Sequence, residues 1–151
     1  MDHDEIGSLI ADLYAGISGP AGYKRDWNRL LSLFMPDAKM IRTSIDGSGR
    51  PQALVMDLAQ YPENVEEKLH GQAFFEMEVQ RITERFGNIA HAFSTYEAWA
   101  DQDRTRFIKR GINSIQLYHD GERWRIVNMI WDDERPDSPM PPGYLAGWNA
   151  R

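Results

Sequence analysis

The second half of the chain alternates strand patterns with short turns, and this feature limits the possible folds more than any other. In QAFFEMEVQRITERF, residues 72 to 86, apolar side chains at positions 75, 77 and 79 alternate with polar ones, which is typical of a strand with one face in the core. Similar patterns follow at residues 89 to 100, 105 to 118 and 123 to 132. Because only short turn sequences separate these stretches, we predict a meander of antiparallel strands.

Three helices and a small hairpin are predicted before the meander. Apolar residues recur at helical spacing over residues 6 to 17, and a second helix begins near Asp26, which can cap it, and ends before Pro36. A hairpin then joins residues 38 to 45 with residues 51 to 56 through an Asp-Gly-Ser-Gly turn. The third helix extends from an Asp57 cap towards Gly71.

The order of these elements predicts the fold class and the domain boundaries. Each helix and each sheet has an apolar face that another element must cover, so we expect an α+β domain with a strongly bent antiparallel sheet against three helices. Since 151 residues suit one core, we place a single domain at residues 1 to 134. Residues 135 to 151 form a proline-rich tail, in which Tyr144, Leu145 and Trp148 are expected to pack on the body or on a partner.

Composition excludes several classes of protein. The chain has no cysteine, which rules out disulfides, thiolate nucleophiles and cysteine zinc sites and fits a reducing cytosol. A net charge of -6 without a basic stripe argues against nucleic acid and anionic membranes as partners. The acidic N-terminal residues are unlike a signal peptide, and no window approaches the ~18 apolar residues of a membrane span. We therefore expect a cytoplasmic protein.

Two stretches of sequence carry a resemblance to a known family. DWNRLLSLFMPDAKM and GERWRIVNMIWDDE, in this order of elements, resemble the nuclear transport factor two-like superfamily and in particular its SnoaL-like domains, over roughly residues 5 to 134. The resemblance implies a cone-shaped sheet with a small-molecule pocket at its wide end and, in many members, a homodimer formed through the outer face of the sheet. Members include ketosteroid isomerases, dehydratases, polyketide cyclases and domains that only bind or scaffold, so the fold alone does not decide the function.

His91 is the first candidate for chemistry. If the last two hairpin turns centre near residues 102 to 103 and 120 to 121, His91 lies beside Ser114 and Val127 on the bulkier face of the sheet. An imidazole in a pocket wall would be a candidate acid and base, since its ordinary pKa lies near neutrality. The alternative is that His91 is a hydrogen-bonded structural residue.

Arg110 is the second candidate, as a stabiliser of a carboxylate or an enolate on the same face. Its alternative role is a cross-strand ion pair with Glu97 or Asp133. Aromatic bulk with a few polar groups is typical of ligand sites. The residues that we expect to line the pocket are Tyr14, Trp27, Phe93, Thr95, Ser114, Met129 and Trp131. Core packing is the alternative for the tyrosine and the two tryptophans.

Other sites are less well supported by the sequence. Where the resemblance places the general base of ketosteroid isomerases, this chain has Arg42 or Thr43. The four histidines lie in separate elements without the i, i+4 spacing of many zinc sites, so we expect no metal. DGSGRP reads as a turn and not as a phosphate cradle, because no helix follows it directly.

Two hypotheses about function follow. In the first, the chain is a lyase or isomerase without a cofactor that acts on a small, largely apolar or weakly anionic molecule with a carbonyl or carboxylate group. In the second, it is a non-catalytic ligand-binding or dimerisation module whose polar groups are already paired with each other. The flat face of the sheet, with Ala90, Ala92 and Gly111, is the expected surface of a homodimer under either hypothesis.

Overall fold

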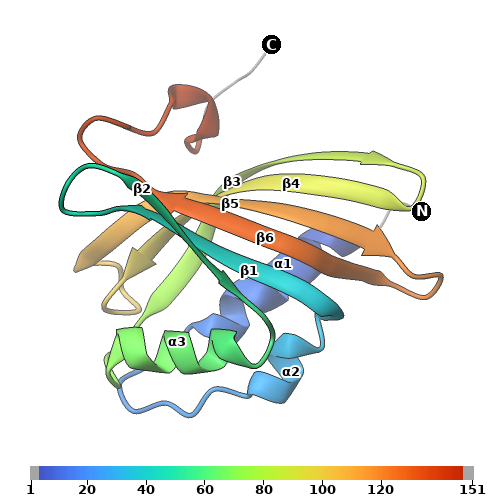
Figure 1. Cartoon of the computed structure of the whole chain (residues 1–151), viewed down its shortest axis with the longest axis horizontal. Helices are drawn as coiled ribbons and strands as arrows, with labels where there is room; N and C mark the ends of the chain where they lie inside the picture. Colours follow the sequence, from blue (N-terminus) through green and yellow to red (C-terminus); the bar gives the residue numbers. More distant parts are fainter. Residues whose placement is uncertain (1–3, 148–151) are drawn as a thin grey trace.

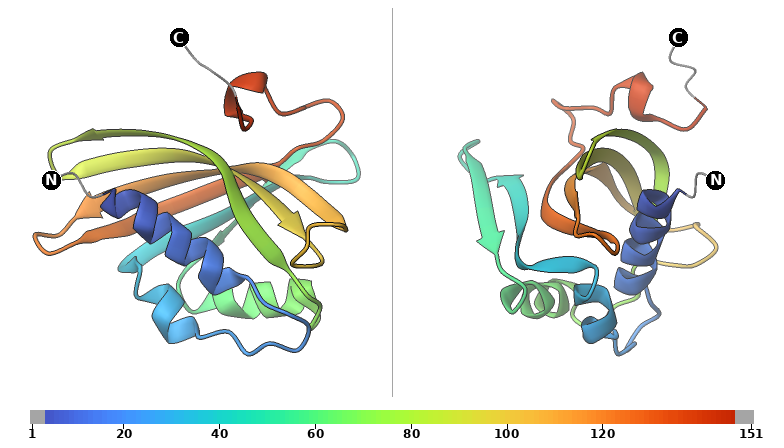
Figure 2. Two further views of the ribbon diagram at one scale, coloured as in Figure 1. Left: turned by 180° about the vertical axis from the view of Figure 1, so that it is seen from behind. Right: turned by 90° about the vertical axis from the view of Figure 1, so that its right-hand side faces the viewer.

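A curved six-stranded sheet with three helices on its concave side makes up most of the molecule (Figure 1, Figure 2). The computed structural model describes residues 4 to 147, so the expectation for Trp148 lies outside the described residues. The elements are α1 (Glu5–Ile17), α2 (Trp27–Leu31), β1 (Phe34–Ile45), β2 (Pro51–Met56), α3 (Gln60–Leu69), β3 (Phe75–Phe86), β4 (Ile89–Trp99), β5 (Phe107–His119), β6 (Trp124–Asp133) and the 3-10 turn η1 (Pro142–Tyr144).

The sheet is mixed and not purely antiparallel. Its strand order is β2-β1-β6-β5-β4-β3, and four of the five neighbouring pairs are the expected antiparallel hairpins. The exception is the parallel pair β1 and β6. Only strands joined by a short turn must be antiparallel, and these two are separated by the whole meander, so the expectation of an antiparallel sheet is wrong at this one junction.

Local sequence signals explain where the helices begin. Asp4 accepts a hydrogen bond from the Gly7 backbone N–H at 2.8 Å, and Asp26 accepts one from Arg29 at 3.1 Å. Asp57 accepts bonds from the backbone of Ala59 and Gln60 ahead of α3. Each carboxylate satisfies an N–H group that has no partner within its helix.

The second helix is shorter than predicted, because β1 begins before Pro36 and not after it. The β1–β6 ladder is irregular between Phe34 and Lys39. A proline has no N–H to donate, so a break in the ladder is the place where a strand can accommodate it.

The core lies between α1 and the concave face of the sheet. Ile10 is fully buried on the inner side of α1, among the side chains of Ile6, Leu13, Tyr14 and Ile17, and Ile115 is fully buried on β5. Burying one such side chain stabilises the fold by about 1.5–3 kcal/mol. Small side chains on β4, Ala92 and Ala98, are also buried, which leaves room for α1 to lie close to the sheet.

The tail crosses the sheet on the side opposite the helices (Figure 1). Tyr144 packs edge-on against Phe93, with 5.3 Å between the ring centroids, and Gln80 Nε2 donates a hydrogen bond of 3.1 Å to the Gly143 carbonyl. The backbone N–H of Met140 donates to the Glu134 carboxylate. These contacts fasten the residues that follow β6 to the outer face of the sheet.

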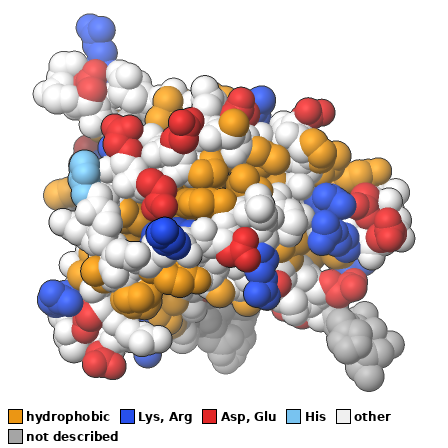
Figure 3. All heavy atoms as spheres, turned by 90° about the horizontal axis from the view of Figure 1, so that it is seen from below, with side chains coloured by type: hydrophobic (Ala, Val, Ile, Leu, Met, Phe, Trp, Pro, Cys, Tyr) orange, Lys and Arg blue, Asp and Glu red, His pale blue; other side chains and the backbone are white. Residues whose placement is uncertain are grey.

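The helical face of the molecule presents hydrophobic side chains among interspersed acidic and basic ones (Figure 3). Within residues 4 to 147, no helix combines the length and the apolar character needed to cross a membrane.

Candidate functional site

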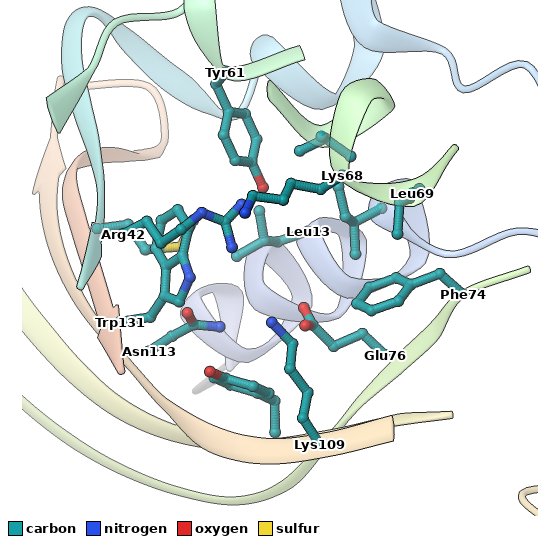
Figure 4. A pocket seen from close by; sticks show the side chains of 14 residues that line it. Leu13, Arg42, Tyr61, Lys68, Leu69, Phe74, Glu76, Lys109, Asn113 and Trp131 are labelled. Atoms are coloured by element: carbon teal, nitrogen blue, oxygen red, sulfur yellow. The ribbon is translucent and has the colours of Figure 1, made fainter. Parts of the chain in front are cut away.

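A cavity opens between the concave face of the sheet and the helices α1 and α3 (Figure 4). It contains about 640 Å³ of empty space, its open mouth included. Much of the wall is apolar, from Leu13, Ile17, Val65, Leu69, Phe74 and Met129. Apolar walls with a few polar groups are the kind of lining that small-molecule sites have.

Glu76 is the acidic side chain in this wall, and it points into the cavity in Figure 4. It faces inward because its cross-strand neighbour is the buried Ala98 on β4 and opposite residues share one face of a sheet. In the part of the chain that the structure describes, its carboxylate has no hydrogen-bond or ion-pair partner. Burial raises the pKa of Glu76 to about 7, with a smaller effect in the same direction from Asp133 and opposing effects from Lys109 and Arg42.

Lys109 brings a positive charge to the same cavity from β5. Its ammonium lies 3.4 Å from the Asp133 carboxylate and 6.0 Å from the centroid of the Tyr96 ring. Asp133 also accepts a hydrogen bond from the Tyr96 hydroxyl. The aspartate therefore holds both donors in place, and Lys109 remains close enough to Glu76 to lower the pKa of its carboxyl.

Gly111 explains how the Tyr96 hydroxyl reaches this position. A Cβ atom added to Gly111 would overlap both the Tyr96 hydroxyl and the backbone carbonyl of Asp132. Only a residue without a side chain allows the ring of Tyr96 to lie against the strand here.

Behind the cavity, a chain of buried hydrogen bonds fixes the orientation of Asn113. Asn113 Nδ2 donates to the Tyr14 hydroxyl at 3.1 Å, and Tyr14 and Ser94 are 2.7 Å apart. Ser94 donates its one hydroxyl proton to Glu78 at 2.6 Å, so Tyr14 must donate to Ser94. Glu78 is in turn bound by Arg81 at 2.6 Å. The amide of Asn113 is therefore held in one orientation where it lines the cavity.

Tyr61 supplies a neutral hydroxyl from α3, and this hydroxyl points into the cavity in Figure 4. Burial raises the pKa of Tyr61 above its usual range, and the nearby Glu76 raises it further. The group therefore stays protonated at neutral pH and acts as a hydrogen-bond donor.

Comparison with solved structures identifies the fold. The chain is similar to a protein of unknown function with a cystatin-like fold from Nostoc punctiforme, with 12% identity over 87% of this chain and 90% of that one and a TM-score of 0.68. An NTF2-like protein of unknown function from Pseudomonas putida shares 14% identity over 97% and 94% of the two chains, with a TM-score of 0.66. The chain has the NTF2-like fold. This confirms the α+β cone predicted from the sequence.

A structure with an assigned activity has the same fold. The hexachlorocyclohexane dehydrochlorinase LinA-type3 from Novosphingobium barchaimii is similar over 87% of this chain and 85% of its own, with 12% identity and a TM-score of 0.64. No family model matches the sequence, and no curated protein is significantly similar to it. At these identities the similarity establishes the NTF2-like fold and leaves the chemistry to be argued from the site.

His91 lies outside the cavity of this NTF2-like cone, so the prediction that it faces inward is wrong. Its side chain is 59% exposed, and its Nε2 lies 2.8 Å from the Glu84 carboxylate on the neighbouring strand. Its cross-strand partner on β5 is Gln116 and not Ser114. The imidazole is therefore on the outer face of the sheet, in a cross-strand pair with a solvated carboxylate.

Arg110 is also on the outer face, and its predicted place in the cavity wall is wrong. It forms an ion pair with Glu134 in which Nε and Nη2 each lie 3.1 Å from a carboxylate oxygen, and a longer contact of 3.8 Å with Glu97. The cross-strand pair with Glu97 that we gave as the alternative is present, while Glu134 takes the place expected for Asp133. A bidentate pair with a carboxylate leaves Arg110 little capacity to bind another anion.

The other predicted pocket residues divide between the two faces. Met129 and Trp131 line the cavity. Tyr14 lies behind it in the hydrogen-bonded chain, and Trp27 packs edge-on against Tyr61 from outside. The residues that the structure places on the outer face are Phe93, Ser114 and Thr95. Thr95 belongs there because it lies between the inward-facing Ser94 and Tyr96.

Strand register accounts for these errors. His91 was expected opposite Ser114 and pairs with Gln116, an offset of two residues that keeps the face. Ser114 was expected opposite Val127 but pairs with Ile130. This offset of three residues moves the β6 side chains to the opposite face of the sheet relative to the prediction. A register shift between Gln116 and Leu117 contributes to this offset. The predicted face therefore combined outer residues of β4 and β5 with inner residues of β6.

Two other predictions also assigned side chains to the wrong side of the sheet. They concern the expected dimer surface and the face of β3 that was expected to lie in the core. Ala90, Ala92 and Gly111 are buried on the inner side of the sheet, so they cannot form an exposed flat surface. On β3, Glu76 and Glu78 are the inward residues, opposite Ala98 and Tyr96. The alternation was read correctly, but its polar side was taken for the solvent side, and the acidic group of the cavity was missed for that reason.

Proposed function

We propose that this protein is a lyase or isomerase that works by acid-base chemistry, without a cofactor, on a small compound with a carbonyl group. The observation that carries the proposal is the carboxylate of Glu76, which lies unpaired within the described chain in a largely apolar cavity. Glu76, and not His91, is the group that we assign as the base. A general base is most effective when its pKa is near the working pH, and that of Glu76 is raised to about 7.

The proposed reaction begins with transfer of a proton from carbon to Glu76. The substrate C–H bond next to the carbonyl breaks, its electron pair forms an enolate, and the proton goes to the Glu76 carboxylate. Lys109, Asn113 and Tyr61 are donors in the same cavity, and donors that face the developing oxyanion stabilise it. Return of the proton to another carbon completes an isomerisation, while loss of a leaving group from the neighbouring carbon completes an elimination.

Two points support an elimination or isomerisation over hydrolysis by a serine or threonine nucleophile. Within residues 4 to 147, the polar groups that line the cavity are carboxyl, ammonium, guanidinium, amide, phenol and indole groups, and none is a serine or threonine hydroxyl. A structurally similar protein is described as a dehydrochlorinase, and we extend to this chain only the idea that the NTF2-like cone can host an elimination.

A non-catalytic binding module is the alternative, and one observation favours it. Several polar groups around the cavity are already paired, as that hypothesis predicts. Tyr14 is bonded to Ser94 and Asn113, and Asp133 is bonded to Tyr96 and Lys109. In this alternative the cavity holds a ligand passively, and Glu76 serves only to orient it.

Proton abstraction can be measured before the substrate is known. Incubation with a panel of small ketones and hydroxy acids in D₂O, followed by mass spectrometry, reports deuterium incorporated at carbon. We expect incorporation by the wild type and a loss of at least about 100-fold in Glu76→Gln, since general bases contribute about 10²–10⁴-fold. Glu84→Gln is the matched control, because Glu84 lies on the same strand but outside the cavity.

The outcomes separate the hypotheses. If Glu84→Gln or His91→Gln abolishes exchange while Glu76→Gln retains it, the assignment of the base is wrong. If compounds of the panel bind and no exchange is detected with the wild type, the binding module is the correct function.

A further inference from the structure

Two cations of the cavity have no counter-ion in the part of the chain that the structure describes. Arg42 on β1 and Lys68 on α3 both line the cavity and project into it (Figure 4). Neither forms an ion pair with a residue between positions 4 and 147. The cavity thus contains positive charge that the protein itself does not neutralise.

The position of Arg42 is fixed by its neighbours. Its Nη2 donates a hydrogen bond of 2.8 Å to Asn64 Oδ1, and its guanidinium lies over the ring of Trp131, 5.4 Å from the centroid. Its Nε is buried and has no hydrogen-bond partner among the described residues. Because this Nε is covered by protein atoms, a ligand in the cavity reaches the terminal nitrogens of the guanidinium, which point into the cavity in Figure 4.

Lys68 approaches the same place from the helix. Asn64 and Lys68 are four residues apart on α3, and residues at this spacing share one face of a helix. Since Asn64 holds the Arg42 guanidinium, Lys68 lies on the helix face that is turned towards it. The residue is exposed overall, which places its ammonium at the mouth of the cavity.

The other charges of the cavity do not compensate for these two. The charge of Lys109 is balanced by Asp133 at 3.4 Å. Glu76 is the remaining acid, and it carries a full negative charge only above neutral pH. With Asp133 counted against Lys109, the charged groups of the cavity therefore have a net charge of plus one to plus two, depending on the protonation of Glu76.

We propose that the substrate is a small monocarboxylate with an apolar body, whose carboxylate group is bound between Arg42 and Lys68. The proposal rests on the function proposed above, and it assigns the orientation of the ligand. The carboxylate end lies at the mouth, the apolar body lies against Trp131 and Phe74, and the reacting carbon faces Glu76. A guanidinium and an ammonium are the groups that bind carboxylates most strongly.

The charge of the cavity and its apolar walls favour one carboxylate over a doubly charged phosphate. With Glu76 ionised, the excess is one positive charge, which one carboxylate neutralises. The rest of the lining consists of aliphatic and aromatic side chains, which cannot solvate a second negative charge. Binding of a monocarboxylate also places a negative charge near Glu76 and favours its protonated form. We therefore expect binding to take up a proton near pH 7 and to weaken as the pH rises.

The test is titration calorimetry with three probes that differ in charge. Phenylacetate carries one negative charge, phenylacetamide is its neutral isostere, and phenyl phosphate carries a larger charge. The variants are Arg42→Gln and Lys68→Gln, and Lys24→Gln is the matched control because Lys24 is an exposed lysine outside the cavity. Deuterium exchange with neutral ketones is measured in parallel.

We expect phenylacetate to bind at least about tenfold more tightly than phenylacetamide, and each cavity variant to weaken phenylacetate about 3- to 10-fold. Lys24→Gln should have no effect. Lys68→Gln keeps the test informative if Arg42→Gln does not fold.

Equal affinity for the amide and the carboxylate, or stronger binding of phenyl phosphate, would overturn the proposal. Exchange of neutral ketones that depends on Glu76 would then still support the function proposed above, so failure of the carboxylate site and failure of the acid-base function are distinguishable.

Discussion

The cavity should make the folding stability depend on pH through Glu76, because this half-buried carboxyl group has no partner in the described chain. Its ordinary pKa is 4.5, and burial raises it to about 7 in the folded protein. Between these values the folded state binds more protons than the unfolded state, so the free energy of unfolding falls as the pH rises from 4.5 to 7. Glu76 therefore destabilises the fold above pH 7 and has little effect below 4.5.

The magnitude follows from the two pKa values. At about 1.4 kcal/mol for each pH unit, the difference corresponds to about 3 kcal/mol, and partial solvation of the carboxyl group reduces this to about 2–3 kcal/mol. Glu76→Gln keeps the shape and removes the titration. We expect the variant to be about 2–3 kcal/mol more stable than the wild type at pH 8 and nearly equal to it at pH 4.5.

Urea unfolding followed by tryptophan fluorescence at several pH values measures this difference. Glu67→Gln serves as the control, since Glu67 is exposed on α3 and forms no ion pair with another described residue, and its effect should vary little over the same range. A difference between the wild type and Glu76→Gln that is the same at pH 5 and pH 8 would refute the reasoning, because it would mean that the carboxyl group is ordinarily solvated.

Three further predictions concern packing, the hydrogen-bonded chain and assembly. Gly111→Ala should destabilise the fold by about 1–3 kcal/mol, because the added Cβ overlaps with neighbouring atoms. Gly47→Ala should not, because a Cβ added there has no atom within 4 Å. Urea unfolding measures both effects. Tyr14→Phe removes the hydrogen bonds with Ser94 and Asn113 and leaves the Asn113 donor without this partner. It should cost about 1–3 kcal/mol, against little for the exposed Tyr23→Phe. Ile89, Tyr118 and Val127 are exposed apolar residues close together on the sheet. We expect sedimentation velocity to show a homodimer through this surface, and Val127→Glu to give a monomer.

The positions of the helices and strands could be predicted from the sequence, whereas the side of the sheet on which each side chain lies could not. Periodicity located the helices and strands within a few residues, because helical spacing, capping aspartates and turn sequences are local signals. The parallel pairing of β1 with β6 and the register shift after Gln116 depend on contacts between distant segments. Since side chains alternate along a strand, an offset of an odd number of residues reverses the face that they occupy.

The site itself was hidden by the same ambiguity. On β3, the alternation of apolar and polar residues does not show which side faces the interior, because the interior contains a cavity with polar groups. Glu76 looked like a solvent-side residue for this reason, and its environment became visible only from its pairing with Ala98. Trp131 and Met129 line the cavity although the register assumed for them was wrong, because the face predicted as the wall combined these inner residues of β6 with outer residues of β4 and β5.

The contrast between His91 and Glu76 shows which property of a group matters for chemistry. His91 has the more suitable ordinary pKa, but it is largely exposed and already bound to Glu84. Glu76 has a less suitable ordinary pKa, and burial moves it to about 7. The unpaired state of Glu76, and of Nε of Arg42, within the described chain is unfavourable for folding. A ligand that carries a carboxylate at one end and an acidic C–H at the other would place an anion at the Arg42 guanidinium and a proton donor at Glu76, and that complementarity links the proposed substrate class to the proposed reaction.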